Sequence, residues 1–134
     1  MRKYLNKIFI YIDAACKKNL RKAMVAVVIK DEANNLLEKF CVEVKNKTSN
    51  QAEYLAALKG LESALKHCRN EINVFSDSEL LVKQLNGKYR IRSKSLLGII
   101  KQIKVLELLF KKVKYKHIKK SKNREAHKLA KRFL

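Results

Sequence analysis

Two short apolar segments of this chain each run into an aspartate, and this pattern restricts how the chain can fold. Residues 7–13 and 72–77 are rich in the β-branched and aromatic residues that favour strands, and they end at Asp13 and Asp77. A segment with helical periodicity separates them, so the right-handed crossover rule makes the two strands parallel if they are neighbours. The two aspartates would then lie at the same edge of the sheet, where α/β folds place their sites.

The remaining segments predict a mixed sheet covered by helices. Alternating or continuous apolar patterns favour strands, and apolar residues at three- and four-residue spacing favour helices. The expected elements are strands at 23–29, 36–44 and 113–118, helices at about 48–68, 78–85, 96–110 and 123–134, and turns or loops at 16–22, 31–35, 88–94 and 119–122. The order β-β-β-α-β-α-α-β-α, without proline or a low-complexity linker, predicts an α/β sandwich in a single domain over residues 1–134.

The charge of the chain points to a polyanionic partner. It has 32 lysines and arginines against 12 acidic residues, a formal net charge of +20. Such an excess favours nucleic acid or an anionic membrane surface; the alternative is that it reflects only the composition bias of an AT-rich genome. The basic residues are spread over strands, loops and helices, which argues against a membrane-surface protein.

The expected location of the protein is cytoplasmic. The apolar run at residues 8–12 is too short for the core of a signal peptide, and no segment approaches the roughly 20 apolar residues of a membrane span. Three scattered cysteines, Cys16, Cys41 and Cys68, form neither a zinc motif nor a disulfide framework, so we expect reduced thiols.

A third carboxylate, Glu53, lies near the start of the helix expected between the two aspartate-bearing strands. A stripe of small residues follows it along that helix: Ala56, Ala57, Gly60 and Ala64. Small side chains let a helix lie close to a sheet, which would bring Glu53 within reach of the two aspartates. Three clustered carboxylates repel one another unless a cation intervenes, and hard oxygen ligands select Mg²⁺ or Mn²⁺. For any one acid alone, a capping or surface role is the alternative.

Four segments of the chain, taken together, resemble the type 1 ribonuclease H family. They are residues 11–19 (Tyr-Ile-Asp-Ala-Ala-Cys-Lys-Lys-Asn), 48–56 (Thr-Ser-Asn-Gln-Ala-Glu-Tyr-Leu-Ala), 75–82 (Phe-Ser-Asp-Ser-Glu-Leu-Leu-Val) and 123–130 (Asn-Arg-Glu-Ala-His-Lys-Leu-Ala). Their order and spacing fit the family along almost the whole chain. The resemblance implies a five-stranded mixed sheet of order 3-2-1-4-5 with helices on both faces.

The resemblance also implies a metal-dependent endoribonuclease that cuts the RNA strand of RNA–DNA hybrids and leaves 5′-phosphate and 3′-hydroxyl ends. The family's carboxylate quartet holds two Mg²⁺ ions. Carried over, Asp13 would bridge both ions, and Glu53 and Asp77 would complete the site of one.

The fourth catalytic position departs from the family pattern. His127 stands where the family most often has aspartate. An imidazole can ligate a transition metal, but it removes one negative charge, so we expect Mn²⁺ to be favoured over Mg²⁺. The alternative is that His127 is no ligand and the protein is a catalytically impaired, ribonuclease H-like module that only binds nucleic acid. A nuclease acting on DNA and a structural ribonucleoprotein component are further alternatives on the same fold.

The expected substrate contacts follow two of the matched segments. The positions that match the family's contacts to the hybrid minor groove and to a DNA phosphate are Cys16, Asn19, Thr48, Ser49, Asn50 and Gln51. For Thr48 and Ser49, helix capping is an alternative that is compatible with substrate contact.

The chain lacks the basic handle of many family members, because residues 85–96 leave no room for it. Nearby basic residues are expected to supply hybrid-binding charge instead, or else to form a solvated loop: Lys88, Arg90, Arg92, Lys94, Lys101 and Lys104. We expect a monomer without an obligate protein partner.

Overall fold

The computed structural model describes residues 3–88, 90 and 93–134. Its strands are β1 (Leu5–Lys17), β2 (Lys22–Lys30), β3 (Leu36–Lys45), β4 (Cys68–Ser76) and β5 (Lys112–His117). Its helices are α1 (Ser49–Ala64), α2 (Glu79–Leu85), α3 (Lys94–Glu107) and α4 (Arg124–Arg132), and two 3₁₀ turns are η1 (Lys18–Leu20) and η2 (Lys120–Lys122). The order of elements expected from the sequence is confirmed.

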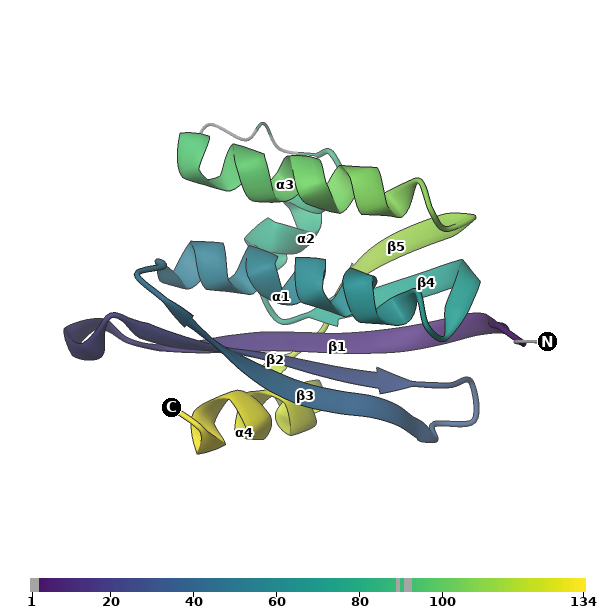
Figure 1. The fold of residues 1–134 in the computed structure, drawn as a ribbon, viewed down its shortest axis with the longest axis horizontal. Helices are drawn as coiled ribbons and strands as arrows, with labels where there is room; N and C mark the ends of the chain where they lie inside the picture. The colour runs from purple at the N-terminus through teal and green to yellow at the C-terminus, as the bar shows by residue number, and fades with distance from the viewer. Residues whose placement is uncertain (1–2, 89, 91–92) are drawn as a thin grey trace.

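The five strands form one mixed sheet of order β3-β2-β1-β4-β5, as expected. β2 pairs antiparallel with β1 and β3, whereas β4 pairs parallel with β1 and β5. Figure 1 shows α1, α2 and α3 on one side of the sheet and α4 on the other. In the described ranges, no helix combines the length and the apolar character needed to cross a bilayer.

Two predicted boundaries are wrong. β1 does not end at Asp13 but continues to Lys17, because this half of the strand stays paired with β2 to the end of the hairpin. The predicted turn at residues 16–22 therefore shrinks to η1 and Arg21, which has a positive φ of 47°. α1 ends at Ala64 rather than near residue 68, because Cys68 is already buried in the sheet as the first residue of β4.

α1 lies close against the sheet through its small residues. A Cβ atom added at Gly60 would lie 3.0 Å from Cγ2 of Ile10 in β1, so a larger side chain at this point would push the helix outward. A capping box fixes the start of the helix: Thr48 Oγ1 accepts from the Gln51 backbone N–H at 3.1 Å, and Gln51 Oε1 accepts from the Thr48 N–H at 2.8 Å. Together these contacts hold Glu53, in the first turns of α1, beside the sheet.

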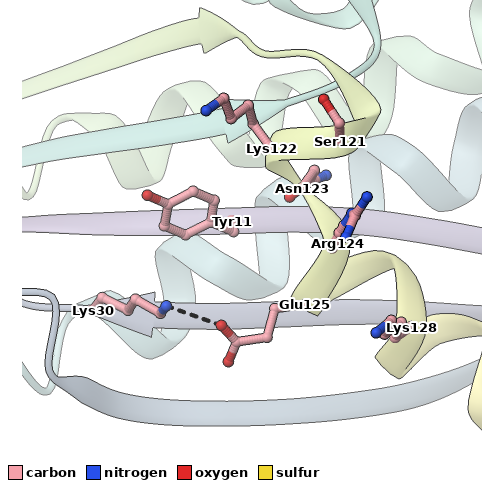
Figure 2. Close-up of a pocket in the computed structure, with 8 residues that line it drawn as sticks. All are labelled: Tyr11, Lys30, Ser121, Lys122, Asn123, Arg124, Glu125 and Lys128. Atoms are coloured by element: carbon pink, nitrogen blue, oxygen red, sulfur yellow. Dashed lines mark ion pairs between the residues drawn. The ribbon is translucent and has the colours of Figure 1, made fainter.

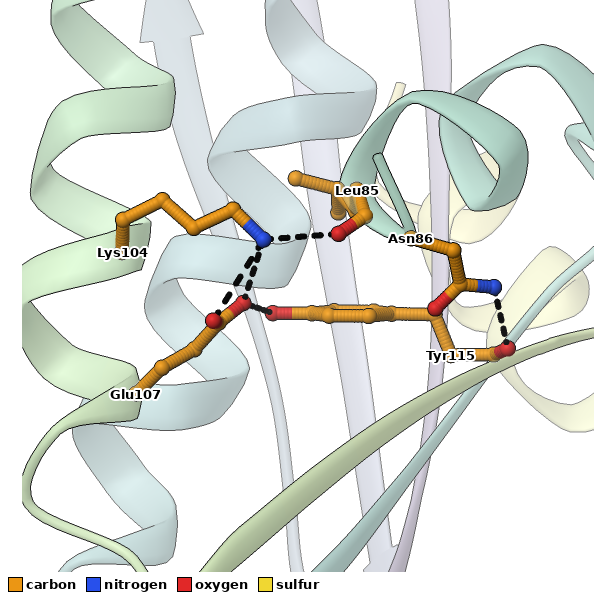
Figure 3. Close-up of polar contacts among 5 residues, drawn as sticks. All are labelled: Leu85, Asn86, Lys104, Glu107 and Tyr115. Carbon is orange, nitrogen blue, oxygen red and sulfur yellow. Dashed lines mark hydrogen bonds and ion pairs between the residues drawn. The ribbon is translucent and has the colours of Figure 1, made fainter. Parts of the chain in front are cut away.

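The helices α2 and α3 are fastened to β5 by a partly buried polar network (Figure 3). The Tyr115 hydroxyl donates to Glu107 at 2.5 Å, and the Lys104 ammonium donates to Glu107 at 3.1 Å and to the Leu85 carbonyl at 2.7 Å. The Asn86 amide donates to the Tyr115 carbonyl at 3.0 Å. Burial and the Glu107 carboxylate raise the pKa of Tyr115, so its hydroxyl keeps its proton. Lys104, expected to contribute hybrid-binding charge, is thus engaged inside this network.

Candidate functional site

The carboxylates of Asp13 and Asp77 lie at the end of the parallel ladder between β1 and β4. The last residues paired in that ladder are Tyr11 and Phe75, and each aspartate is two residues further along its strand direction. Asp13 is 8% exposed on β1, and Asp77 directly follows β4. Because parallel strands advance together, the two residues emerge at the same edge of the ladder, as their spacing in the sequence predicts.

Glu53 of α1 lies in the electrostatic field of both aspartates. Burial raises the pKa of Glu53, and the nearby charges of Asp13 and Asp77 raise it further, whereas a hydrogen bond from Ser78 and the charge of Lys120 lower it. Burial also raises the pKa of Asp13, with a further contribution from Asp77. The three carboxylates therefore form one repelling group, held together by the fold.

His127 of α4 contacts this group directly. Its Nδ1 lies 2.8 Å from Oδ2 of Asp13, the distance of a hydrogen bond in which the imidazole N–H donates to the carboxylate. This bond lowers the pKa of Asp13, although burial outweighs it. The structure thus places His127 beside Asp13, one of the other three residues expected from the sequence.

Asn123, just before α4, fastens three elements of the site, and the sequence interpretation did not assign it a role. Its amide Nδ2 donates to the Ile12 carbonyl at 2.8 Å and approaches Oδ2 of Asp77 at 3.4 Å. The residue is 1% exposed, and its Oδ1 is buried without a partner. The sequence feature that could have indicated this role is the position of Asn123 as the first residue of the fourth matched segment, residues 123–130.

The donors of this site have the chemistry that Mg²⁺ or Mn²⁺ requires, namely carboxylate oxygens and one imidazole. In the ranges that the structure describes, however, no three Asp, Glu, His or Cys side chains are grouped closely enough to form an ion site. Each carboxylate has a hydrogen-bond donor of its own: Asp13 is contacted by His127, Glu53 by Ser78 and Asp77 by Asn123. A bound dication would replace these contacts and relieve the repulsion.

A basic groove of about 650 Å³ lies where the β1–β2 hairpin faces the start of α1. Its lining consists of Cys16, Lys17, Lys18, Arg21, Lys22, Asn46, Lys47, Thr48, Ser49 and Asn50. Four of the six expected substrate contacts line it: Cys16, Thr48, Ser49 and Asn50. Asn19 and Gln51 do not line it, and the side-chain oxygen of Gln51 is used in the capping box. Residues 16–22 were expected to be a turn, so the basic side chains that gather here were missed.

The basic residues expected to replace the handle lie elsewhere. Lys94 and Lys101 belong to α3, and Lys88 and Arg90 lie in the connection before it. None of these four lines the basic groove among the described residues. Arg92 lies outside the described residues.

Comparison with known proteins agrees with the family resemblance noted in the sequence. Residues 11–133 match the model of a family described as reverse transcriptase-like. The chain is 30% identical over 105 residues to the bifunctional protein Rv2228c of Mycobacterium tuberculosis, a match that covers 78% of this chain and 29% of that protein. The chain thus spans less than a third of the length of this relative.

Two of the solved structures that share the fold illustrate the similarity. The N-terminal RNase H domain of Rv2228c from M. tuberculosis, determined as a fusion with maltose-binding protein, aligns with a TM-score of 0.89 and 26% identity, covering 96% of this chain and 93% of that one. LC11-RNase H1 in complex with an RNA/DNA hybrid aligns with a TM-score of 0.86 and 30% identity, covering 93% and 94%.

Replacing Asn123 by alanine is expected to lower the free energy of unfolding by about 1–3 kcal/mol, because the buried Ile12 carbonyl loses its donor. Asn70→Ala is the matched control: it removes an exposed amide that also donates to a backbone carbonyl, and it is expected to change stability by less than about 0.5 kcal/mol. Urea denaturation of both variants measures the difference. Equal losses would contradict the assigned role of Asn123.

Proposed function

The chain belongs to the type 1 ribonuclease H family, and from this premise we propose that it is a metal-dependent endoribonuclease that hydrolyses the RNA strand of RNA–DNA hybrids. The single observation that carries the proposal is the position of Asp13 and Asp77 at the same end of the β1–β4 ladder, with Glu53 near enough for the charges of both aspartates to raise its pKa. A protein of net charge +20 that gathers three carboxylates at one end of its parallel strands has a site suited to cations facing a polyanion.

Asp13, Glu53, Asp77 and His127 are the residues that would hold two divalent ions. Bound there, such ions would supply an activated water and would stabilise the leaving 3′ oxygen, and the products would then carry 5′-phosphate and 3′-hydroxyl ends. The chain's own contribution is to hold these ligands ready. The Ser78 hydroxyl orients Glu53, and the Asn123 amide ties Asp77 to β1.

We propose the basic groove as the binding site of the hybrid. Hydroxyl and amide groups at Ser49 and Asn50 can exchange hydrogen bonds with sugar 2′-hydroxyls, the groups that distinguish RNA from DNA, and Thr48 is placed to contact a phosphate of the DNA strand. The lysines that line the groove can contact phosphates without regard to sequence, so binding should weaken steeply with salt. A monomer suffices for this arrangement, because one chain supplies both the groove and the carboxylates.

Hybrid cleavage with an end-labelled RNA strand tests the proposal directly. Asp13→Asn is expected to lower the rate by about 100-fold or more in Mg²⁺ and in Mn²⁺, because it removes the carboxylate expected to be shared by both ions. Glu62→Gln, an exposed carboxylate change on α1, is the matched control and should leave the rate unchanged. Salt-sensitive binding of the hybrid in EDTA should persist in both variants.

The proposal is overturned if the folded native protein leaves the hybrid intact under both metals. Equal cleavage of single-stranded RNA or of duplex RNA would contradict the assigned substrate, even if cleavage needs Asp13.

One observation favours a second candidate, a binding module that has lost catalysis. His127 hydrogen-bonds to Asp13 and so occupies an oxygen that an ion would need. His127→Asp distinguishes the two functions. For an active enzyme, the change should lower the ratio of the Mn²⁺ rate to the Mg²⁺ rate by roughly tenfold or more, since it restores a hard ligand.

His67→Asn is the control, because His67 lies just after the C-terminal end of α1, whereas Glu53 lies near the start of that helix. This change should leave the ratio of the Mn²⁺ rate to the Mg²⁺ rate unchanged. Cleavage that is absent in the native protein and appears only in His127→Asp would identify an impaired site. Inactivity of both proteins would favour the binding module.

A further inference from the structure

One half of the sheet face that carries α4 has no helix over it in the described part of the chain (Figure 1). α4 packs on β1, β2 and β3 through a small cluster around Met24, Ala26 and Ala130. This cluster lies toward the hairpin end of β1, where Ala15 also contributes. The other half of the face, formed by the first part of β1 together with β4 and β5, is left open.

Three aromatic rings stand in a row on this open half. Phe75 of β4 stacks against Phe9 with ring centroids 5.9 Å apart and against Tyr11 with centroids 5.0 Å apart, at interplanar angles of 16° and 25°. All three side chains are only partly buried, and none belongs to either hydrophobic cluster of the core. The rings therefore add little to the core, and they present an aromatic surface to solvent. We call Phe9, Tyr11 and Phe75 the aromatic row.

Lysines border the aromatic row on both sides. Residues paired across neighbouring strands point to the same face of a sheet, so the ladder partners of the row share its face. Phe75 pairs with Lys116 of β5 and Phe9 pairs with Lys30 of β2. The Lys30 ammonium also lies 5.9 Å from the centre of the Tyr11 ring, within the range of a cation–π contact.

A pocket of about 350 Å³ extends this surface toward α4 (Figure 2). Its lining consists of Tyr11, Lys30, Ser121, Lys122, Asn123, Arg124, Glu125 and Lys128. Figure 2 shows the Tyr11 ring over β1, with Lys30 on one side and Lys122 on the other. The aromatic row thus continues into a cationic recess.

Acids balance part of the charge around the aromatic row. Glu125 is paired with Lys30 at 2.9 Å, and Glu71 is paired with Lys7 at 3.4 Å and with Lys114 at 3.8 Å. Asp31 and Glu32 of the β2–β3 hairpin line a recess together with the three rings, so the cationic part of the border lies on the β5 and α4 sides. No ion pair is recorded within the described residues for the remaining cations around the row: Lys116, Lys122, Arg124 and Lys128.

We propose that the aromatic row and its lysine border bind single-stranded nucleic acid, with bases stacked on the rings and phosphates against the lysines. Aromatic side chains stack with any base, and a cationic border follows the backbone, which is the common design of sequence-tolerant single-strand sites. A paired duplex cannot use the rings, since its bases already stack on each other. The positive charge of the border complements the phosphates of a nucleic acid strand, and it favours such a strand over an apolar protein surface.

This second surface is continuous with the carboxylate group. Tyr11 precedes Asp13 by two residues on β1, about 7 Å along the strand. An unpaired stretch of a strand whose paired part lies in the basic groove could therefore reach the aromatic row. Binding of a free single strand does not depend on catalysis, so the two proposals can fail separately.

The test is fluorescence anisotropy in EDTA with labelled oligothymidylate and oligouridylate of roughly ten nucleotides. The double variant Phe9→Leu with Phe75→Leu keeps the apolar character of the surface but removes two stacking faces. This variant is expected to bind both single strands at least about fivefold more weakly, with an unchanged dependence of the affinity on salt concentration. Its affinity for a blunt-ended hybrid should not change. If stacking is the cause, the loss of affinity should be the same for the RNA and the DNA strand.

Charge is tested with a matched pair of lysine variants. Lys116→Gln is expected to weaken single-strand binding and to reduce the salt slope by about 0.7. Lys59→Gln on α1, at the other face of the sheet, should have no such effect. Unchanged single-strand affinity in the leucine double variant, or an equal loss for the blunt hybrid, would overturn the proposal.

Crosslinking of the native protein avoids any folding defect of the variants. Ultraviolet crosslinking of oligo-5-iodouridylate, mapped by mass spectrometry, should label Phe9, Tyr11 or Phe75. Crosslinks confined to the basic groove would overturn the proposal.

Discussion

The parallel pairing of β1 with β4 is the contact on which the rest of this structure depends. It sets Asp13 beside Asp77, and the close approach of α1 through Gly60 adds Glu53 to the same edge. Bringing carboxylates together at a partly buried site is unfavourable: burial raises the pKa values of Asp13 and Glu53, and the charge of Asp77 raises both further. Packing of the surrounding core maintains this arrangement, since the strands and α1 cannot separate without exposing their buried apolar residues.

Hydrogen-bond donors from two helices and their caps offset this repulsion. His127 comes from α4, Asn123 from the N-cap of the same helix and Ser78 from the N-cap of α2. These hydrogen bonds hold each carboxylate separately near the end of the β1–β4 ladder, an arrangement that suits a cation site. Around this group the surface is strongly basic, and it divides into a groove beside α1 and an aromatic row on the opposite face.

Much of this arrangement follows from local sequence patterns. The order of elements, the meeting of Asp13 and Asp77 at one edge and the small-residue stripe of α1 are all visible in residue spacing, because strands and helices have fixed periods. The contacts between distant residues are not visible in this way. His127 and Asp13 are 114 positions apart, and so the hydrogen bond between them has no local signal. The length of β1 was misjudged for a similar reason, since its pairing with β2 continues after its pairing with β4 stops. The basic groove was missed because it joins residues 16–22 to residues 46–50, which are far apart in the sequence.

The central claim is that these side chains form a site for divalent cations. Anomalous diffraction from Mn²⁺-soaked crystals tests it most directly. The account predicts two Mn²⁺ peaks roughly 3.5–4 Å apart, ligated by Asp13, Glu53 and Asp77 and with His127 at one of them. Saturating Mn²⁺ that leaves no peak within ligand distance of Asp13 would contradict it.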